Sequence, residues 1–149
     1  MKQLIVSAAL LLSALQVGAA EKKVFRISTE QTDLILQVGD NGRLYQTYLG
    51  KKLLNENDIQ NLSWDIHAGS DGSVSKRGWE VYSGSGNEEY FEPAIAVTHN
   101  DGNNSTYLYY VSSSTEAVDG GTKTTINLRD DQYPVEVALH YVAYPKENV

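Results

Sequence analysis

Cysteine is absent from the 149 residues, and its absence excludes two kinds of architecture. No disulfide can form, so stability must come from the core alone. That situation is common in bacterial periplasmic proteins and rarer in small extracellular eukaryotic ones. A lipid-anchored bacterial lipoprotein is also excluded, because no cysteine follows the N-terminal leader to carry the lipid.

Basic residues are few. The chain has 12 Lys and Arg against 19 Asp and Glu, a formal net charge of −7. Lys2 is the only charged residue among the first twenty, so removing that segment leaves −8. An acidic surface repels phosphate backbones and anionic headgroups, so we expect neither nucleic acid nor membrane as a partner.

Only the N-terminus contains a long apolar run. Lys2 precedes an apolar segment over residues 4–15, and Gly18, Ala19 and Ala20 supply the small residues that a signal peptidase needs. The run is short for a bilayer span, which makes a membrane anchor the weaker alternative. We therefore predict a cleaved signal peptide over residues 1–20, a periplasmic or secreted protein, and one domain over residues 21–149.

Long helical patterns are missing after residue 20, and strand patterns take their place. Alternating apolar residues and turn residues predict a hairpin over 34–38 and 43–49, joined by the turn at 39–42. Further strands are expected at 24–28, 94–99, 105–112, 122–130 and 133–144. In the last, Tyr133, Val135, Val137, Leu139 and Tyr141 share one face, with Pro134, Glu136 and His140 on the other. Its length indicates part of a large antiparallel β-sandwich rather than a small barrel.

Residues 55–78 form a polar segment with little periodicity, in which Trp64, Ile66 and the following Trp79 are the large apolar anchors. A loop of this length in a compact domain is either functional or poorly ordered.

Catalytic and cofactor motifs are also lacking. Gly84-Ser85-Gly86 is too short for a nucleophile elbow, and no glycine-rich loop has the Lys-Ser/Thr that a phosphate site requires. His67, His99 and His140 are far apart, so we expect no metal and no cofactor. The Asp101-Gly102-Asn103 sequence fits a tight turn better than a calcium loop.

The stretch over residues 79–99 joins a glycine-rich loop to a predicted strand that Pro93 begins. Carboxylates and aromatic rings gather in it: Glu88, Glu89, Glu92, Tyr82, Tyr90 and Phe91. Such residues suit a sugar, since glycoside hydrolysis uses paired carboxylates and aromatic rings pack on apolar ligand surfaces. A solvated acidic loop held by aromatic anchors explains the pattern equally, and nothing in the sequence places an acid and a base at working distance.

At this stretch the chain resembles a known family. The segments that carry the resemblance occur in one order: residues 42–50 (GRLYQTYLG), Tyr82, residues 86–94 (GNEEYFEPA), Asn100-Asp101-Gly102, Leu108-Tyr109-Tyr110, Leu128-Arg129-Asp130, and residues 137–144 (VALHYVAY). Their order is similar to that in the N-terminal domain of glycoside hydrolase family 36, in a Bacteroides-like bacterial α-galactosidase. Two positions depart from the family pattern. Ser83 follows Tyr82 where Tyr-Pro is common, and Glu89-Tyr90-Phe91 replaces Asp-Phe-Arg, so the ion pair of that Arg is lost.

The resemblance implies a supersandwich-like domain, present here in part, that precedes a catalytic (β/α)8 barrel. The family's catalytic Asp residues lie on the barrel and act with retention. No catalytic residue is therefore expected here, and the chain should be inactive alone. The implied partners are that barrel, α-galactosides bound through the parent protein, and further copies in an oligomer. Trp64 and Asp65 are the residues where a loop of this domain would approach substrate; a surface loop with one buried Trp is the alternative.

Two other functions remain open at this point. One is a stand-alone carbohydrate-binding module that stacks sugars on Trp64, Trp79, Tyr82 and Tyr90. The other is an assembly protein that adds a strand to the free edge of its last strand, which directly precedes the end of the sequence.

Overall fold

The computed structural model describes residues 23–60, 62, 79–86 and 92–149, and the predicted signal peptide lies outside them. The strands of the described part are β1 (Val24–Ser28), β2 (Thr32–Val38), β3 (Leu44–Lys51), β4 (Trp79–Glu80), β5 (Leu108–Val118), β6 (Gly121–Asp130) and β7 (Glu136–Ala143). A single helix in these ranges, α1, covers Glu56–Gln60. None of the described helical segments is long and apolar enough to cross a membrane.

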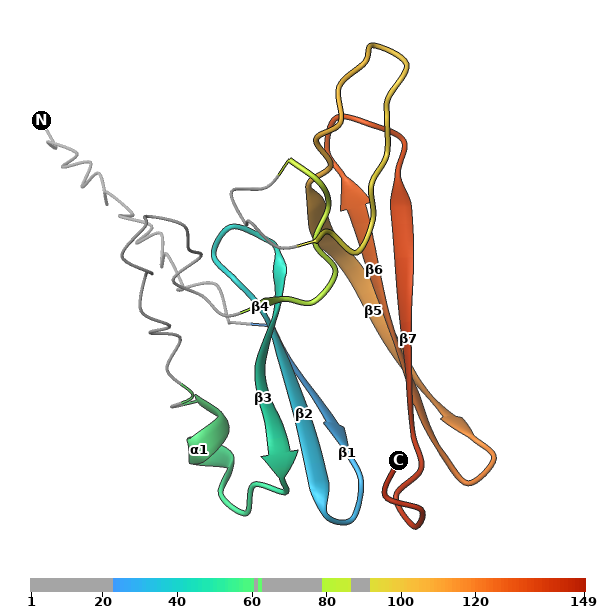
Figure 1. The fold of residues 1–149 in the computed structure, drawn as a ribbon. Coiled ribbons are helices and arrows are strands. Elements are labelled where there is room, and N and C mark those ends of the chain that lie inside the picture. The colour runs from blue at the N-terminus through green and yellow to red at the C-terminus, as the bar shows by residue number, and fades with distance from the viewer. Residues whose placement is uncertain (1–22, 61, 63–78, 87–91) are drawn as a thin grey trace, which may run out of the picture.

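The strands form two antiparallel sheets that face each other (Figure 1). One has the order β1-β2-β3-β4 and the other β5-β6-β7. Their facing sides share a single hydrophobic core, built from Phe25, Leu36, Leu44, Leu108, Ile126 and Leu128. The Phe25 and Tyr110 rings meet across it at 5.7 Å between centroids. The predicted all-β, sandwich-like architecture is confirmed.

The β2–β3 hairpin follows the sequence pattern closely. Gly42 adopts φ +78°, which a turn of this kind requires and which glycine adopts without strain. The N–H of Gly42 donates to the carbonyl of Gly39 (2.8 Å), and the N–H of Gly39 donates to the carbonyl of Arg43 (2.9 Å). The turn also reaches the second sheet, since the N–H of Tyr110 donates to the carbonyl of Gly42 (2.8 Å).

The predicted strand over residues 94–99 is wrong. Burial alternates there, with Ile95 and Val97 half-buried, but the segment has one parallel bridge, Gly84 to Ile95. The N–H groups of Ala94 and Ile95 both donate to the carbonyl of Ser83 (2.9 and 3.2 Å). Alternating side chains therefore predicted which residues lie inward, but not that a neighbouring strand would be missing.

Two of the strands have other bounds than predicted: β5 covers Leu108–Val118 where 105–112 was expected, and the last strand is shorter. The last strand has eight residues, because the turn that precedes it extends further than the apolar pattern indicated. Its faces are as predicted: Val135, Val137, Leu139 and Tyr141 pack against the core, and Glu136 and His140 are exposed. Helix α1 was not predicted; Asn55 begins it, with Oδ1 accepting from the N–H of Asn57 (3.0 Å).

A buried carboxylate holds the segment that follows β3, where the chain leaves the first sheet. Asp33 on β2 has no exposed surface. Its Oδ2 accepts from Arg26 Nη2 (2.8 Å) and from the N–H of Leu53 (2.7 Å), and its Oδ1 accepts from Ser28 Oγ (2.6 Å). Arg26 also donates to the carbonyl of Leu53 (2.6 Å) and pairs with Glu56 on α1. One carboxylate thus joins β1, β2 and the segment that leads to α1.

The pKa of Asp33 is lower than its ordinary value. Burial alone would raise it, but the hydrogen bonds from Arg26, Ser28 and the Leu53 N–H stabilise the charged form and outweigh the burial. The bond to Asp33 in turn raises the pKa of Arg26.

We expect Asp33→Asn to lower the free energy of unfolding by about 2–4 kcal/mol, because Arg26 loses its buried counter-charge and an amide cannot accept at both positions. Urea denaturation measures this loss. Asp119→Asn removes the same charge from an exposed hairpin turn and should change stability little. Equal effects of the two substitutions would contradict the assignment.

The same carboxylate makes stability depend on pH. Because the folded pKa of Asp33 lies below the unfolded one, the folded state binds fewer protons in mild acid, and stability rises with pH there. The contribution is complete above the unfolded pKa, about 4, and is lost as pH falls through the lower folded pKa. Denaturation midpoints of the native chain and Asp33→Asn across this range should converge in acid; a constant difference would contradict the prediction.

Candidate functional site

The rim built from residues 79–86 and 92–107 is held to the β2–β3 turn by an ion pair. Arg43 Nε donates to Glu80 Oε1 (3.2 Å), and its Nη2 pairs with Glu80 Oε2. The Glu80 side chain is 2% exposed, so its carboxylate is almost completely shielded from solvent. The Arg43 guanidinium also lies 5.7 Å from the centre of the Tyr107 ring. Glu80 is therefore part of the scaffold of the rim.

Backbone contacts close the rim over the start of β5. The N–H of Ser85 donates to Ile95 (3.1 Å), the N–H of Thr106 donates to Ser85 (2.9 Å), and the Tyr107 hydroxyl donates to Gly86 (3.1 Å), each at a carbonyl oxygen. Gly84 is buried where the chains cross, and a Cβ there would overlap the carbonyl of Thr106. Glycine is required here by close approach of two backbones.

A second cluster lies at the turn over residues 99–103. The His99 ring stacks on Tyr133, with centroids 3.5 Å apart and planes 7° from parallel. The Tyr133 hydroxyl donates to Asp101 (2.9 Å) and accepts from Asn103 Nδ2 (2.9 Å). The bond to Asp101 raises the pKa of Tyr133, while the Asn103 N–H and that hydroxyl lower the pKa of Asp101. The cluster ties this turn to the β6–β7 connection, and Asp101-Gly102-Asn103 is the tight turn that its sequence predicts.

Asp130 ends β6 and fixes the same connection. It is 3% exposed, and it accepts from three backbone N–H groups: Tyr107 at 2.7 Å, Gln132 at 2.8 Å and Tyr133 at 2.8 Å. Burial would raise its pKa, but these three bonds lower it more. Such a carboxylate stays ionised and fully occupied, so it is unsuited to proton transfer.

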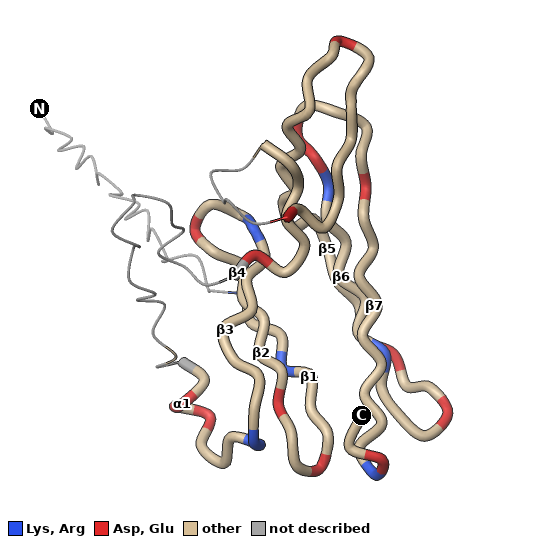
Figure 2. Tube along the Cα trace, in the orientation of Figure 1, with Lys and Arg blue, Asp and Glu red and all other residues tan. Residues whose placement is uncertain are grey.

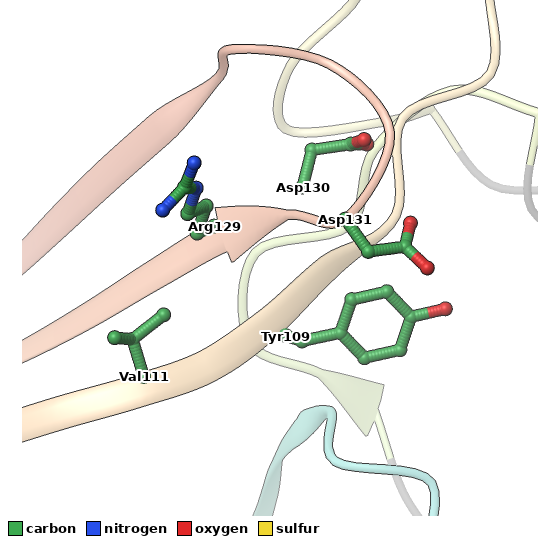
Figure 3. A pocket seen from close by; sticks show the side chains of 5 residues that line it. All are labelled: Tyr109, Val111, Arg129, Asp130 and Asp131. Atoms are coloured by element: carbon green, nitrogen blue, oxygen red, sulfur yellow. The ribbon is translucent and has the colours of Figure 1, made fainter.

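A shallow hollow of about 340 Å³ opens beside Asp130, lined also by Tyr109, Val111, Arg129 and Asp131 (Figure 3). Asp131 and Arg129 are exposed, and Tyr109 is half-buried. Burial and the nearby Asp131 carboxylate raise the pKa of Tyr109, so its hydroxyl stays protonated.

The predicted site residues meet different outcomes. Trp64 and Asp65 lie outside the described residues, as do Glu88, Glu89, Tyr90 and Phe91. Tyr82 packs against the hydrophobic core, so its ring serves the fold. Glu92 is exposed. The hollow was not predicted, because its side chains come from two strands and a turn.

The most deeply buried carboxylates of the described ranges have structural partners. Asp33, Glu80 and Asp130, the most deeply buried, are each held by hydrogen bonds or an ion pair that supports the fold. No three His, Asp or Glu side chains of these ranges are placed to hold a metal ion. Acidic residues in the described part lie mainly at strand ends and in turns, and basic residues are dispersed (Figure 2).

We expect Gly84→Ala to destabilise the protein by at least about 2 kcal/mol, because the new Cβ overlaps backbone that cannot rotate away. Gly102→Ala is the matched control: Gly102 has φ +86° but open space around it, and strain alone should cost about 1 kcal/mol. Thermal unfolding of both variants makes the comparison. A larger loss of stability in Gly102→Ala than in Gly84→Ala would be inconsistent with the close approach of two backbones at Gly84.

Comparison with known proteins identifies the family. Residues 42–149 match the model of the glycosyl hydrolase family 36 N-terminal domain. The comparison with curated proteins found no match. Among solved structures, the α-galactosidase AgaA from Geobacillus stearothermophilus superposes with a TM-score of 0.67 at 21% identity. An α-galactosidase from Lactobacillus brevis gives 0.66 at 20% identity.

Each superposition covers 83% of this chain and 20% of the other, so the chain spans about a fifth of the length of these enzymes. At these identities the likeness shows a shared fold. The family match covers more than two thirds of the chain; it begins at Gly42, the last residue of the β2–β3 turn, and includes β3, the rim and the second sheet. The chain therefore belongs to the N-terminal domain family of glycosyl hydrolase family 36.

Proposed function

We propose that this chain is the non-catalytic N-terminal part of a secreted α-galactosidase that hydrolyses terminal α-galactosides. One observation carries the proposal: the family match over residues 42–149, in a fold that superposes on a fifth of α-galactosidases. The remaining four fifths of such an enzyme would contain its catalytic barrel. Export rests on the leader over residues 1–20, a sequence-based prediction.

The role we assign is structural. The domain packs against the barrel and contributes to oligomer contacts, with Trp64 and Asp65 as the residues that approach substrate. The arrangement of its carboxylates supports a role without catalysis. Asp33 and Asp130 accept three hydrogen bonds each, and Glu80 is paired with Arg43. A general acid must be free to exchange its proton with a glycosidic oxygen, and these three are not.

Exposed apolar side chains at the end of β3 supply surface for such packing. Leu49 is 63% exposed and Leu54 is 96% exposed. Leu49 and Leu54 flank the end of β3, beyond the two residues that pair with β4. Covering them with protein would remove apolar surface from water.

We predict that the chain alone does not hydrolyse a chromogenic α-galactoside, whereas the product of the reading frame extended past Val149 does. The physical reason is that the three most deeply buried carboxylates of the described part, Asp33, Glu80 and Asp130, are held by hydrogen bonds or an ion pair that support the fold. Release of the chromophore, measured with both proteins at equal concentration, makes the test. Turnover by the chain alone comparable to that of the longer product would overturn the non-catalytic role.

The packing role is tested by deletion. Removing residues 21–149 from the longer product should leave a barrel with an uncovered face, which lowers its soluble yield and raises its apparent mass in sizing chromatography. A fully active, monodisperse barrel would argue against this role. A downstream sequence that encodes no barrel at all would remove the proposal.

A further inference from the structure

The hollow beside the end of β6 is lined by one aromatic ring, one apolar side chain and charged side chains of both signs. Tyr109 and Val111 come from β5, Arg129 and Asp130 end β6, and Asp131 begins the turn to β7. Figure 3 shows the Tyr109 ring and the Asp131 carboxylate next to each other, with Arg129 and Val111 toward the other end. The volume, about 340 Å³, is at the small end of the range for ligand sites.

The aromatic side chain is held in place before any ligand arrives. The Tyr109 ring lies against Gly42, where a Cβ would stand 3.4 Å from its Cδ1. The next residue, Tyr110, donates its N–H to the carbonyl of Gly42 (2.8 Å), which fixes the strand against the turn. A ring fixed on one side binds a ligand at little cost in conformational entropy.

The charged side chains stand on equally rigid backbone. Asp130 holds the turn by three N–H bonds, so the position of Asp131 is set by its neighbour. Arg129 faces Glu136 on β7, with Nε 3.7 Å from Oε1, and its side chain is 61% exposed. Its remaining N–H groups are therefore accessible to a ligand.

The two opposite charges disfavour a simple anion and a simple cation as the ligand. A simple anion would meet the carboxylate of Asp131, and a simple cation would meet the guanidinium of Arg129. A neutral polyhydroxylated ring satisfies both, because hydroxyls donate to carboxylates and accept from guanidinium groups. Its apolar face also matches the Tyr109 ring and Val111.

We propose that this hollow is a non-catalytic subsite for one neutral sugar ring of an oligosaccharide, with the ring on Tyr109 and its hydroxyls on Asp131 and Arg129. The choice of an α-galactoside as the probe rests on the proposed function; the presence of a sugar subsite does not. In the parent enzyme, such a site would hold oligosaccharide without reacting with it.

The test uses the isotopically labelled chain and raffinose, with sucrose as the matched sugar that lacks the galactosyl ring. We expect raffinose in the millimolar range to shift the amide signals of Tyr109, Arg129 and Asp131 in two-dimensional NMR spectra. Asp131→Asn and Tyr109→Ala should weaken binding at least about tenfold. Ser114→Ala, an exposed position further along β5, should bind as the native chain does.

Several results would separate the possibilities. Absence of shifts with either sugar, or shifts that Asp131→Asn does not reduce, would overturn the subsite. Asparagine has nearly the same shape as aspartate. If the NMR spectrum shows that Asp131→Asn is folded, any loss of sugar binding is due to the lost carboxylate and not to unfolding. Equal binding of raffinose and sucrose supports a neutral-sugar subsite while counting against galactosyl recognition. The subsite and the catalytic role of the parent enzyme can thus fail independently.

Discussion

The packing of two small sheets on one shared hydrophobic layer is the interaction on which the described structure depends. Without cysteine, no disulfide joins the sheets. Leu36, Leu44 and Phe25 from one sheet meet Leu108, Ile126 and Leu128 from the other, and all six are at least nine-tenths buried. Polar contacts between the sheets lie at the ends: Tyr110 to Gly42 at one, and Glu30 to Pro145 at the other (3.2 Å). The core therefore supplies the attraction, and the end contacts set the alignment.

Two buried aspartates have a second role, which is to fix where the chain leaves each sheet. Asp33 holds the segment after β3 through the Leu53 N–H, and Asp130 holds the turn after β6 through three N–H groups. In both cases desolvation opposes the charge and hydrogen bonds more than offset it. The same two groups that organise the connections are thereby unavailable for acid–base chemistry.

The use of buried and clustered polar groups to hold the fold is consistent with a domain that has a structural role. At the turn over residues 99–103, the fold brings His99 and Asp101 together with Tyr133, three side chains of the kinds used in acid–base catalysis. Stacking and hydrogen bonds occupy these side chains: His99 stacks on Tyr133, and Tyr133 donates a hydrogen bond to Asp101. The side chains left accessible in a shared hollow are Tyr109, Arg129 and Asp131, a set suited to holding a neutral ligand.

The sequence alone determined the class of the fold and the inward faces of most strands. Period-two alternation places Leu34, Leu36 and Val38 on one side, and glycine at residue 42 supplies the positive φ of the first hairpin. Its ordered motifs also indicated the family. Tertiary structure decided the rest. Ile95 and Val97 alternate as a strand would, yet no partner strand lies beside them in the described part, and Tyr82 belongs to the core. Asp33, Asp130 and the Tyr109 hollow depend on neighbours distant in the chain, such as Leu53, Tyr107 and Gly42. Local patterns encode which side of a segment is apolar, whereas pairing and burial of charge depend on contacts that form only when the two sheets meet.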